Sequence, residues 1–501
     1  MQHEQRLTVH QLASGEQTAG DSRFGGGERT QTTIVSTGPG GAHRLPAERL
    51  AEEALGAPEI ACRNLEMSHR DPHREPNLSQ DAAIGALAPG ADVALPFGWT
   101  RPPGPAAAAN DWTPPQLAAL VAHLATAGAS ALSALTRDAL LDAWSDTVER
   151  FRDPHGSERT VLEPGLVRRT GLAPRSLAAA LEVVLAGVSR EPARRLFARA
   201  VPLEQAAPAL VVLAGNLPAL GLQPLLPALA LRRPLLLKSP SAEPLFLPAF
   251  VRALATRLPA AGEAIAALCW RGGDPRLEAP ILAGVDRVLA YGDAPALADL
   301  TRRAPGRVLG YGPKASLALV GAEADLRTCA RGLARDIALF DQRGCLSVHA
   351  VYCAGAASEL AERLAGELAQ IAGELPPGEG SLTARAAVRQ ARDEAALRGL
   401  ETPPLDFSLG TVLVEPRLAF RPSPGLRTVR IHPVGELASS LGALECWNGR
   451  LQGVALAGAS AWALRAELER LGCSRFAEPG ELQSVDAAWA NGGIDPLVAL
   501  G

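Results

Sequence analysis

The chain has 501 residues, which is enough for two or three domains and a large hydrophobic core. A hydrophobic content of 47% and a charged content of 20% are typical of a soluble globular protein. The formal net charge of −4 gives no electrostatic reason to expect nucleic acid or an acidic membrane surface as a partner. The seven cysteines are scattered without CxxC spacing, and no His, Cys and acid cluster has metal-ligand spacing. We therefore expect a cytoplasmic protein with no disulfide framework and no metal.

Residues 1–112 are polar, rich in Gly, Pro and His, and end in a proline-rich linker, so they are predicted to be a disordered extension. The first residues lack the charged-then-apolar layout of a signal peptide. Residues 205–231 carry no charge and are long enough to span a bilayer. Prolines interrupt that stretch, which predicts a buried strand, loop and helix and no membrane span.

The packed part of the chain begins with helical apolar spacing over residues 113–200. Short apolar runs that end in Gly, Asn or Pro then alternate with helical stretches. This alternation indicates an α/β fold with parallel sheets that bind ligands at the carboxyl ends of their strands. We expect two Rossmann-like α/β lobes with the active site between them. The first covers residues 113–315 and binds a cofactor, the second covers 316–480, and 481–501 form a C-terminal segment.

Two motifs place polar side chains after predicted strands of the first lobe. In "LAGNLPALGLQPLLPAL", Asn216 follows a buried strand and precedes a helix entered through Pro218, where its amide has the chemistry to donate to a developing oxyanion. Asn is also an ordinary turn or cap residue. In "LLLKSPSAEP", a strand leads to Lys238, the only lysine before residue 314. A lysine at a strand end is usually a solvated surface residue, but its rarity in this chain favours contact with a ribose or a phosphate.

Two further motifs are a strand-to-helix turn and a cysteine. "VLAYGDAPALADL" places a Gly between a strand and a helix whose N-terminus offers free N–H groups to a phosphate, although GxGxxG is absent. In "FDQRGCLSVH", Cys345 lies between a helical run (326–340) and a strand. A reactive cysteine is found at such an element end with its thiolate stabilised, whereas a buried structural cysteine is inert. The motif favours a nucleophile over a small core residue.

Taken in order, "AGNLP", "KSPSAEP", "AYGDAP", "GYGPKASLALV" and "FDQRGC" resemble the aldehyde dehydrogenase superfamily over residues 160–495. "DQRGCLS", "GYGPKAS" and "LGCSRFAEPGELQ" are similar to one branch of it, the acyl-CoA reductases of the bioluminescence fatty-acid-reductase type. The resemblance implies an aldehyde-dehydrogenase-like fold. It also implies that Cys345 is the catalytic nucleophile, and that Asn216 forms the oxyanion hole together with the Cys345 backbone N–H.

The same resemblance implies the cofactor contacts. Lys238 matches the lysine that contacts the adenosine ribose of a nicotinamide cofactor, and Tyr291, Gly292 and Asp293 occupy the turn beside the cofactor pyrophosphate. NAD-preferring members often carry Glu three residues after the lysine, where this chain has Ser241. Because serine leaves room for a 2′-phosphate without charge repulsion, we expect NADP(H), with NAD(H) as the alternative.

Two departures from the family pattern concern water activation. Aldehyde-oxidising members have a Glu that activates water to hydrolyse the acyl-enzyme, and its place here is Gly310. A second family Glu falls at about Val429. An S-acyl-Cys345 intermediate without a general base should persist until a thiol or a hydride arrives. The expected reaction is the NADPH-dependent reduction of an acyl thioester, such as a fatty acyl-CoA, to the aldehyde.

Other readings remain open at the level of sequence. One is an aldehyde dehydrogenase that forms free acid with Glu436 or Glu445 as base. Another is a cysteine acyltransferase that uses a Cys345–His349 pair without redox chemistry, and a third is a non-catalytic subunit. Arg343 is a candidate for lowering the pKa of the Cys345 thiol, or an ordinary surface residue. An acyl-protein synthetase-like partner and a homo-oligomer are expected from the resemblance alone.

Overall fold

The computed structural model describes residues 94–96 and 112–501 of the chain. The extension and linker predicted for residues 1–112 therefore lie outside the described residues, apart from two short pieces. One of these, Ala94, forms an antiparallel bridge with Ala267, with N···O distances of 2.9 Å in both directions. The proposed domain boundaries stay a prediction, because no independent observation fixes them.

The predicted helical lead-in over residues 113–200 is present. The Thr113 backbone N–H donates to Gln116 Oε1 at 3.0 Å, and Thr136 Oγ1 accepts from the Ala139 N–H at 3.1 Å, so both helix starts have capped N–H groups. These helices are α3 (Pro114–His123), the π-helical turn η2 (Leu124–Gly128), α4 (Ala129–Ser133), α5 (Arg137–Arg152), α6 (Ser157–Thr170), α7 (Pro174–Gly187) and α8 (Arg190–Arg199).

The first lobe contains a five-stranded sheet that is parallel throughout, in the order β3-β2-β1-β4-β5. Three strands follow the sequence expectation, whereas β3 and β5 were not anticipated. β3 directly follows α11 within one apolar stretch, so no turn marks its start, and β5 is half-exposed and contains Gly310. The elements are β1 (Ala209–Val212), α9 (Leu222–Ala230), β2 (Leu235–Lys238), α10 (Phe246–Arg257), α11 (Pro259–Ala264), β3 (Ile265–Leu268), α12 (Pro275–Gly284), β4 (Arg287–Tyr291), α13 (Ala294–Arg303) and β5 (Val308–Tyr311).

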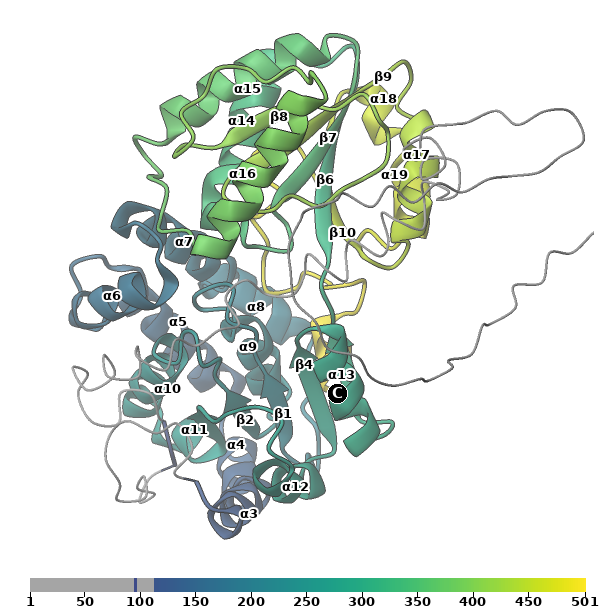
Figure 1. Ribbon diagram of the computed structural model, residues 1–501. Coiled ribbons are helices and arrows are strands. Elements are labelled where there is room, and N and C mark those ends of the chain that lie inside the picture. The colour runs from purple at the N-terminus through teal and green to yellow at the C-terminus, as the bar shows by residue number, and fades with distance from the viewer. Residues whose placement is uncertain (1–93, 97–111) are drawn as a thin grey trace, which may run out of the picture. The chain divides into compact units, whose positions relative to one another are not determined.

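Helices cover both faces of this sheet, as Figure 1 shows. In β2, Leu235 and Leu237 belong to the core that includes α5, α7, α8, α9 and α10, whereas Leu236 faces the core formed with α3 and α12. Alternate side chains of each strand therefore enter different cores. This explains why the strands read as continuous apolar runs and not as alternating ones.

The second lobe contains a six-stranded parallel sheet in the order β11-β10-β6-β7-β9-β8. Each of its strands lies within an apolar run that the sequence pattern identifies. The elements are β6 (Ala315–Val320), α14 (Leu326–Ala338), the 3₁₀ turn η3 (Leu339–Gln342), β7 (Val348–Ala354), α15 (Ala357–Ile371), α16 (Leu382–Leu397), β8 (Thr411–Val414), β9 (Thr428–Val434), α17 (Ser439–Leu444), the 3₁₀ turn η4 (Glu445–Trp447), β10 (Leu451–Ala457), α18 (Ala459–Trp462), α19 (Arg465–Arg470), β11 (Arg475–Ala477) and α20 (Pro496–Leu500).

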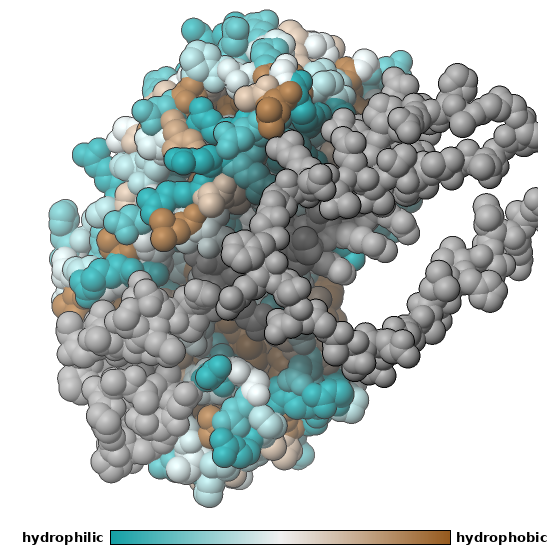
Figure 2. All heavy atoms as spheres, in the orientation of Figure 1, coloured by the Kyte–Doolittle hydropathy of each residue, from teal (hydrophilic) through white to brown (hydrophobic). Residues whose placement is uncertain are grey.

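The second sheet is also covered on both faces. Helices α14 and α15 share one core with it, and α17 to α19 with the turn at Trp447 share the other. On the face shown in Figure 2, hydrophilic side chains predominate over α15 and α16, with hydrophobic ones scattered among them. Strands buried on both faces and connected by helices are what the predicted α/β class requires.

Residues 205–231 fold as expected into a buried strand, a loop and a helix. The helix differs in one detail, because α9 begins at Leu222 and not near Pro218. Among the described residues, Pro114–Ser133 has the length and apolar composition to cross a membrane, and the bent pair α6 with α7–α8 would be a second only if counted as one span. In this structure Leu117, Leu120 and Val121 of the first stretch are buried against α12.

Candidate active site

The order of the first sheet places the predicted site residues at one edge. β1 and β4 are neighbours although β2 and β3 lie between them in the sequence. From β1 the chain adds strands toward one side of the sheet, and from β4 it adds them toward the other. Asn216 follows β1, and Tyr291 ends β4. The carboxyl ends of two strands that flank such a switch point are where open α/β sheets bind ligands. The fold therefore brings these two sequence-predicted positions to the carboxyl edge of the sheet, on either side of the switch point.

A hydrogen bond joins this edge to the cysteine loop of the second lobe. Asn216 Nδ2 donates to the Arg343 carbonyl oxygen at 3.1 Å, and a Cβ at Gly344 would lie 3.8 Å from Leu217 Cδ1. The loop thus holds Asn216 next to the residues that precede Cys345. Because an amide nitrogen carries two hydrogens, one N–H of Asn216 is engaged and the other is left for a ligand.

Cys345 is a half-buried thiol whose surroundings act in opposite directions. Burial raises its pKa to about 11, while the backbone N–H groups of Cys345 and Leu346 and the positive charge of Lys314 lower it. The Cys345 carbonyl accepts a hydrogen bond from Ser316 Oγ at 2.7 Å, which ties the loop to β6. Other cysteines that are fully buried have a similarly raised pKa, and Cys345 differs from them in its partial exposure and in combining backbone N–H groups with the charge of Lys314. The expected stabilisation of the thiolate is therefore present but outweighed by burial.

The turn before Cys345 has an unusual backbone. The helical run expected over 326–340 ends at Ala338, because Phe340, Asp341 and Gln342 adopt φ of 57°, 49° and 62°. Left-handed backbone costs a non-glycine residue about 1–2 kcal/mol. Three such residues in succession need strong external support.

Gln342 supplies much of that support from its buried side chain. Its Nε2 donates to the carbonyls of Val348 and Thr428, each at 2.7 Å. Its Oε1 accepts from the Thr428 N–H at 2.9 Å and from Ser423 Oγ at 3.0 Å. All four hydrogen-bonding positions of the amide are therefore filled. The turn that carries Cys345 is fixed to β7 and β9 through this single side chain.

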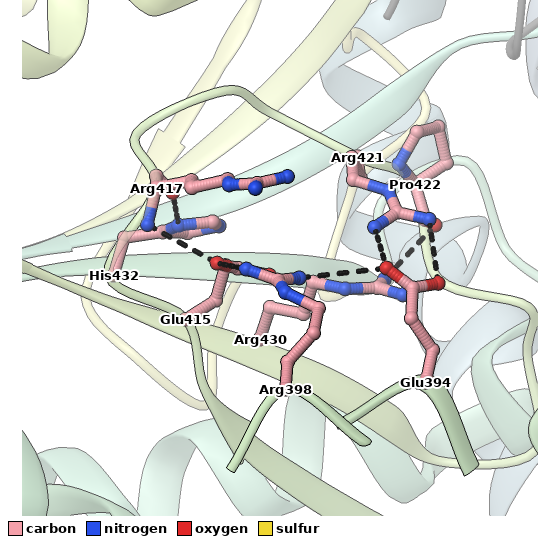
Figure 3. A network of polar contacts seen from close by, with 8 residues as sticks. All are labelled: Glu394, Arg398, Glu415, Arg417, Arg421, Pro422, Arg430 and His432. Atoms are coloured by element: carbon pink, nitrogen blue, oxygen red, sulfur yellow. Dashed lines mark hydrogen bonds and ion pairs between the residues drawn. The ribbon is translucent and has the colours of Figure 1, made fainter. Parts of the chain in front are cut away.

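A charged network holds the segment that contains Ser423 (Figure 3). Arg421 donates to the Glu394 carboxylate at 2.7 and 3.2 Å, and buried Arg430 donates to the Pro422 carbonyl at 3.3 Å. The Ser423 N–H donates to His349 Nδ1 at 3.0 Å. His349 therefore contacts this support segment, and its pairing with Cys345 stays a prediction of one alternative reading.

The neighbouring Asp341 forms a buried ion pair with Arg427. Arg427 Nε and Nη2 donate to Asp341 Oδ1 at 2.9 and 2.6 Å, and both side chains are almost fully buried. Asp341→Asn keeps the side-chain size and suits left-handed backbone, but it leaves the buried guanidinium uncompensated. We expect the free energy of unfolding, measured with urea, to fall by about 3–5 kcal/mol.

Asp142→Asn is the matched control for this experiment, because Asp142 pairs with Arg190 at 2.7 Å on the surface. An exposed pair is worth about 0–1 kcal/mol, so the control should unfold close to the wild-type urea concentration. Equal losses in the two variants would contradict the assigned role of the buried pair.

Lys238 is almost fully buried at the end of β2, and burial lowers its pKa. Its Nζ lies 5.4 Å from the centroid of the Trp270 ring. Within residues 94–96 and 112–501, no carboxylate lies at salt-bridge distance from this ammonium. The nearby Glu278 instead binds Arg303 at 2.5 Å and accepts from Trp270 Nε1 at 3.2 Å. A buried cation without a carboxylate partner is suited to bind hydroxyl or phosphate oxygens of a ligand.

The other predicted cofactor residues occupy turns beside Lys238 and β4. Ser241 is exposed, whereas Glu243 nearby turns inward and accepts from the N–H groups of Leu245 and Phe246 at 2.7 and 2.9 Å. Among the described residues of this turn, no acidic side chain therefore takes the position of the Glu that binds the ribose 2′-hydroxyl in NAD-preferring enzymes. Asp293 Oδ1 caps α13 by accepting from the Ala296 N–H at 2.9 Å.

Tyr291 makes contacts that were not anticipated, and its placement beside a pyrophosphate stays a prediction. Its ring stacks on Tyr311 with centroids 4.9 Å apart, and its hydroxyl hydrogen-bonds Asn491. Burial raises the pKa of the Tyr291 hydroxyl, and the nearby Tyr311 and Cys345 raise it further. Gly292 follows it, and its N–H donates to the Tyr311 carbonyl at 3.2 Å.

The positions considered for water activation carry either no carboxylate or an exposed one. A Cβ at Gly310 would contact Leu297 of α13 at 3.2 Å, and Val429 is buried in the core of the second sheet. Glu436 and Glu445 are exposed on the surface. In the described part of the chain, no carboxylate contributes to the pKa of Cys345.

Three residues of this region were not identified from sequence. Lys314, Gln342 and Asn491 all belong to the surroundings of Cys345. Gln342 and Asn491 carry no sequence signal, because single amides are common in turns. Lys314 does carry one, since it and Lys238 are the only lysines of the chain.

The architecture is that of aldehyde dehydrogenases. The salicylaldehyde dehydrogenase of Pseudomonas putida G7 superimposes with a TM-score of 0.59 over 77% of this chain and 86% of that one, at 15% identity. A glyceraldehyde-3-phosphate dehydrogenase of Methanocaldococcus jannaschii, complexed with NADP, superimposes with a TM-score of 0.59 over 75% of this chain and 87% of that one, at 12% identity. At such identities the likeness establishes the fold, and the predicted aldehyde-dehydrogenase-like class is confirmed.

The family is more specific than the fold. The family model described as "Acyl-CoA reductase (LuxC)" matches residues 188–501, and this chain belongs to that family. The long-chain acyl-protein thioester reductase of Aliivibrio fischeri is 27% identical over 296 residues, which are 58% of this chain and 61% of that protein. A second such reductase, from Photobacterium leiognathi, is 26% identical over 302 residues, which are 58% of this chain and 62% of that protein. Each match spans about three fifths of the relative's length.

Proposed function

We propose that this protein reduces a long-chain acyl thioester to the aldehyde, with NADPH as reductant and S-acyl-Cys345 as intermediate. One observation carries the proposal. Asn216 is hydrogen-bonded to the residue two positions before Cys345, two backbone N–H groups act on the thiol, and Gly310 occupies the place of the water-activating Glu of aldehyde-oxidising enzymes. Such a site has an acceptor for the acyl group and donors for its oxygen, but no base for water. The names of the family and its relatives supply the substrate class.

The nicotinamide cofactor would lie along the carboxyl edge of the first sheet. The buried Lys238 ammonium is available for ribose oxygens, and Ser241 leaves space without negative charge for a 2′-phosphate. Gly292, which has no side chain, precedes the N-terminus of α13, and the partial positive charge of that helix end favours a pyrophosphate there. When bound, the cofactor supplies hydride to the acyl carbon. These residues fit the group, and Ser241 favours NADP(H) over NAD(H).

In the first half-reaction, the Cys345 thiolate attacks the thioester carbonyl carbon. A new C–S bond forms, and the carbonyl oxygen becomes an oxyanion that the free N–H of Asn216 and the Cys345 backbone N–H stabilise. Collapse restores the carbonyl and breaks the original C–S bond. The thiolate of the acyl carrier is the leaving group, and it takes a proton from solvent.

In the second half-reaction, the same donors stabilise the alkoxide of the thiohemiacetal, now reduced by two electrons. Collapse to the aldehyde breaks the C–S bond, and the electron pair returns to Sγ as thiolate. Without a carboxylate to activate water, S-acyl-Cys345 persists until it is reduced. That persistence separates this proposal from an acid-forming aldehyde dehydrogenase.

The acyl donor has two candidate forms within one chemistry. The family description names acyl-CoA, whereas the relatives are named acyl-protein thioester reductases. We propose acyl-CoA as the minimal substrate, and an acyl-protein synthetase-like partner as a second source. A homo-oligomer in the cytoplasm remains an expectation from the resemblance.

The test is aldehyde formation from palmitoyl-CoA with NADPH or NADH, followed by gas chromatography. We expect aldehyde with both reductants and a KM at least roughly tenfold lower for NADPH. Lys238→Met should raise the KM for NADPH by roughly tenfold or more, since a charge-assisted hydrogen bond is worth about 1.5–3 kcal/mol. Arg276→Met, at an exposed arginine, is the control. Palmitic acid formed in place of aldehyde would refute the proposal.

A further inference from the structure

Lys314 is a cation at the active site that the reaction scheme above does not use. It precedes β6, and Ser316, two residues later, donates its hydroxyl to the Cys345 carbonyl at 2.7 Å. Lys314 directly precedes the first residue of β6, and the cysteine loop is hydrogen-bonded to the second. Lys314 and the cysteine loop therefore meet the same end of β6.

The contacts of the ammonium show where it ends. Lys314 Nζ donates a hydrogen bond to the Leu451 carbonyl at 3.5 Å, which is the longest distance for such a bond. A Cβ at Gly492 would lie 3.6 Å from Lys314 Nζ and 3.7 Å from Tyr311 Cε1. Among the residues described, no carboxylate forms a salt bridge with it. A half-buried ammonium with one long hydrogen bond retains donors for another partner.

The titratable groups around this ammonium are few. Cys345 faces it from the turn before β7, and Cys473 from the segment before β11. Tyr291 interacts with Cys345 from β4 and stacks on Tyr311 of β5. The two thiols and the two phenols are protonated and therefore neutral at pH 7. Lys314 is thus the charged group among them.

We propose that Lys314 is the charge partner of the Cys345 thiolate. It stabilises the thiolate before attack on the thioester, and again when the thiohemiacetal collapses and the electron pair returns to sulfur. The role extends the proposed function and rests on Cys345 being the nucleophile. Burial opposes the charged thiol, and Lys314 acts in the other direction, which agrees with this role.

The test measures alkylation of Cys345 in the full-length protein without substrate. Iodoacetamide rates are followed by mass spectrometry of the Cys345 peptide between pH 7 and 9.5, where the rate is proportional to the thiolate fraction. We expect Lys314→Met to lower the rate roughly tenfold or more at every pH, since an opposite charge nearby shifts a pKa by about one unit or more and each unit is a factor of ten. Lys314→Arg should stay within about threefold of wild type, because it keeps the charge.

Arg276→Met is the control, because it removes a cation of the first lobe from an exposed position outside the proposed site. Its alkylation rate should equal that of wild type. Anionic iodoacetate adds a second readout, since Lys314→Met should lose more reactivity toward iodoacetate than toward neutral iodoacetamide.

An unchanged rate in Lys314→Met, or an equal loss in Lys314→Arg, would overturn the assignment. The outcome is separable from the proposed function. If Cys345→Ala kept its reductase activity, the proposed function would fail whatever the alkylation rates show.

Discussion

Replacing Cys345 with alanine should abolish aldehyde formation from palmitoyl-CoA and NADPH, by roughly a thousandfold or more. The proposed reaction passes through a covalent bond to this sulfur, and no other group can take its place without moving the acyl carbon. Activity is measured as aldehyde released, and binding of NADPH is measured separately by fluorescence. We expect that binding to survive, because the proposed cofactor contacts lie on the first lobe.

Cys446→Ala is the matched control for this variant. Cys345 and Cys446 are the two half-buried cysteines of the described residues, and the other described cysteines are buried. The control should retain aldehyde formation within about twofold. Loss of activity in Cys446→Ala with retention in Cys345→Ala would place the nucleophile elsewhere.

Asn216→Ala has the second largest expected effect, a loss of roughly 10²–10³ in the rate of acyl transfer to Cys345. Removal of one oxyanion-hole donor from comparable sites costs about that much. The geometry allows a second explanation, because Asn216 Nδ2 also donates to the Arg343 carbonyl and so holds the cysteine loop. The measurement has to separate stabilisation of the oxyanion from positioning of the thiol.

Alkylation by iodoacetamide separates them, because displacement at its carbon forms no oxyanion. An oxyanion role predicts that Asn216→Ala alkylates at Cys345 within about threefold of wild type while acyl transfer falls. A positioning role predicts that both rates fall together. The second result would remove Asn216 from the catalytic groups.

Much of the fold was predictable from the sequence for a physical reason. Strands buried on both faces give continuous apolar runs, and the helices between them have long amphipathic periods. The runs around β1, β2, β4 and β6 to β11 were therefore visible. β3 and β5 are short, and β5 is half-exposed with Gly310 inside it, so its apolar signal is weak.

The site was predictable where residue type and chemistry coincide. Cys345 and Asn216 were proposed as a thiol and an amide at element ends, and in the structure Asn216 is hydrogen-bonded to the Arg343 carbonyl, two residues before Cys345. The direction of Arg343 was not predictable, since its guanidinium reaches across to the Thr170 carbonyl and not to the thiol.

The left-handed turn at Phe340–Gln342 was not predictable either. No glycine marks it, and its stability comes from residues far along the chain, namely Ser423, Arg427 and Thr428. Local sequence describes propensities, whereas this backbone is imposed by tertiary contacts.

The most direct measurement of the central claim is a single turnover on Cys345. The protein is mixed with palmitoyl-CoA without nicotinamide, and the Cys345 peptide is examined by mass spectrometry for the acyl mass before and after NADPH is added. The account predicts a stable acyl-Cys345 that clears to aldehyde only with NADPH. An acyl-Cys345 that hydrolyses unaided to palmitic acid, or an acyl mass on another residue, would contradict it.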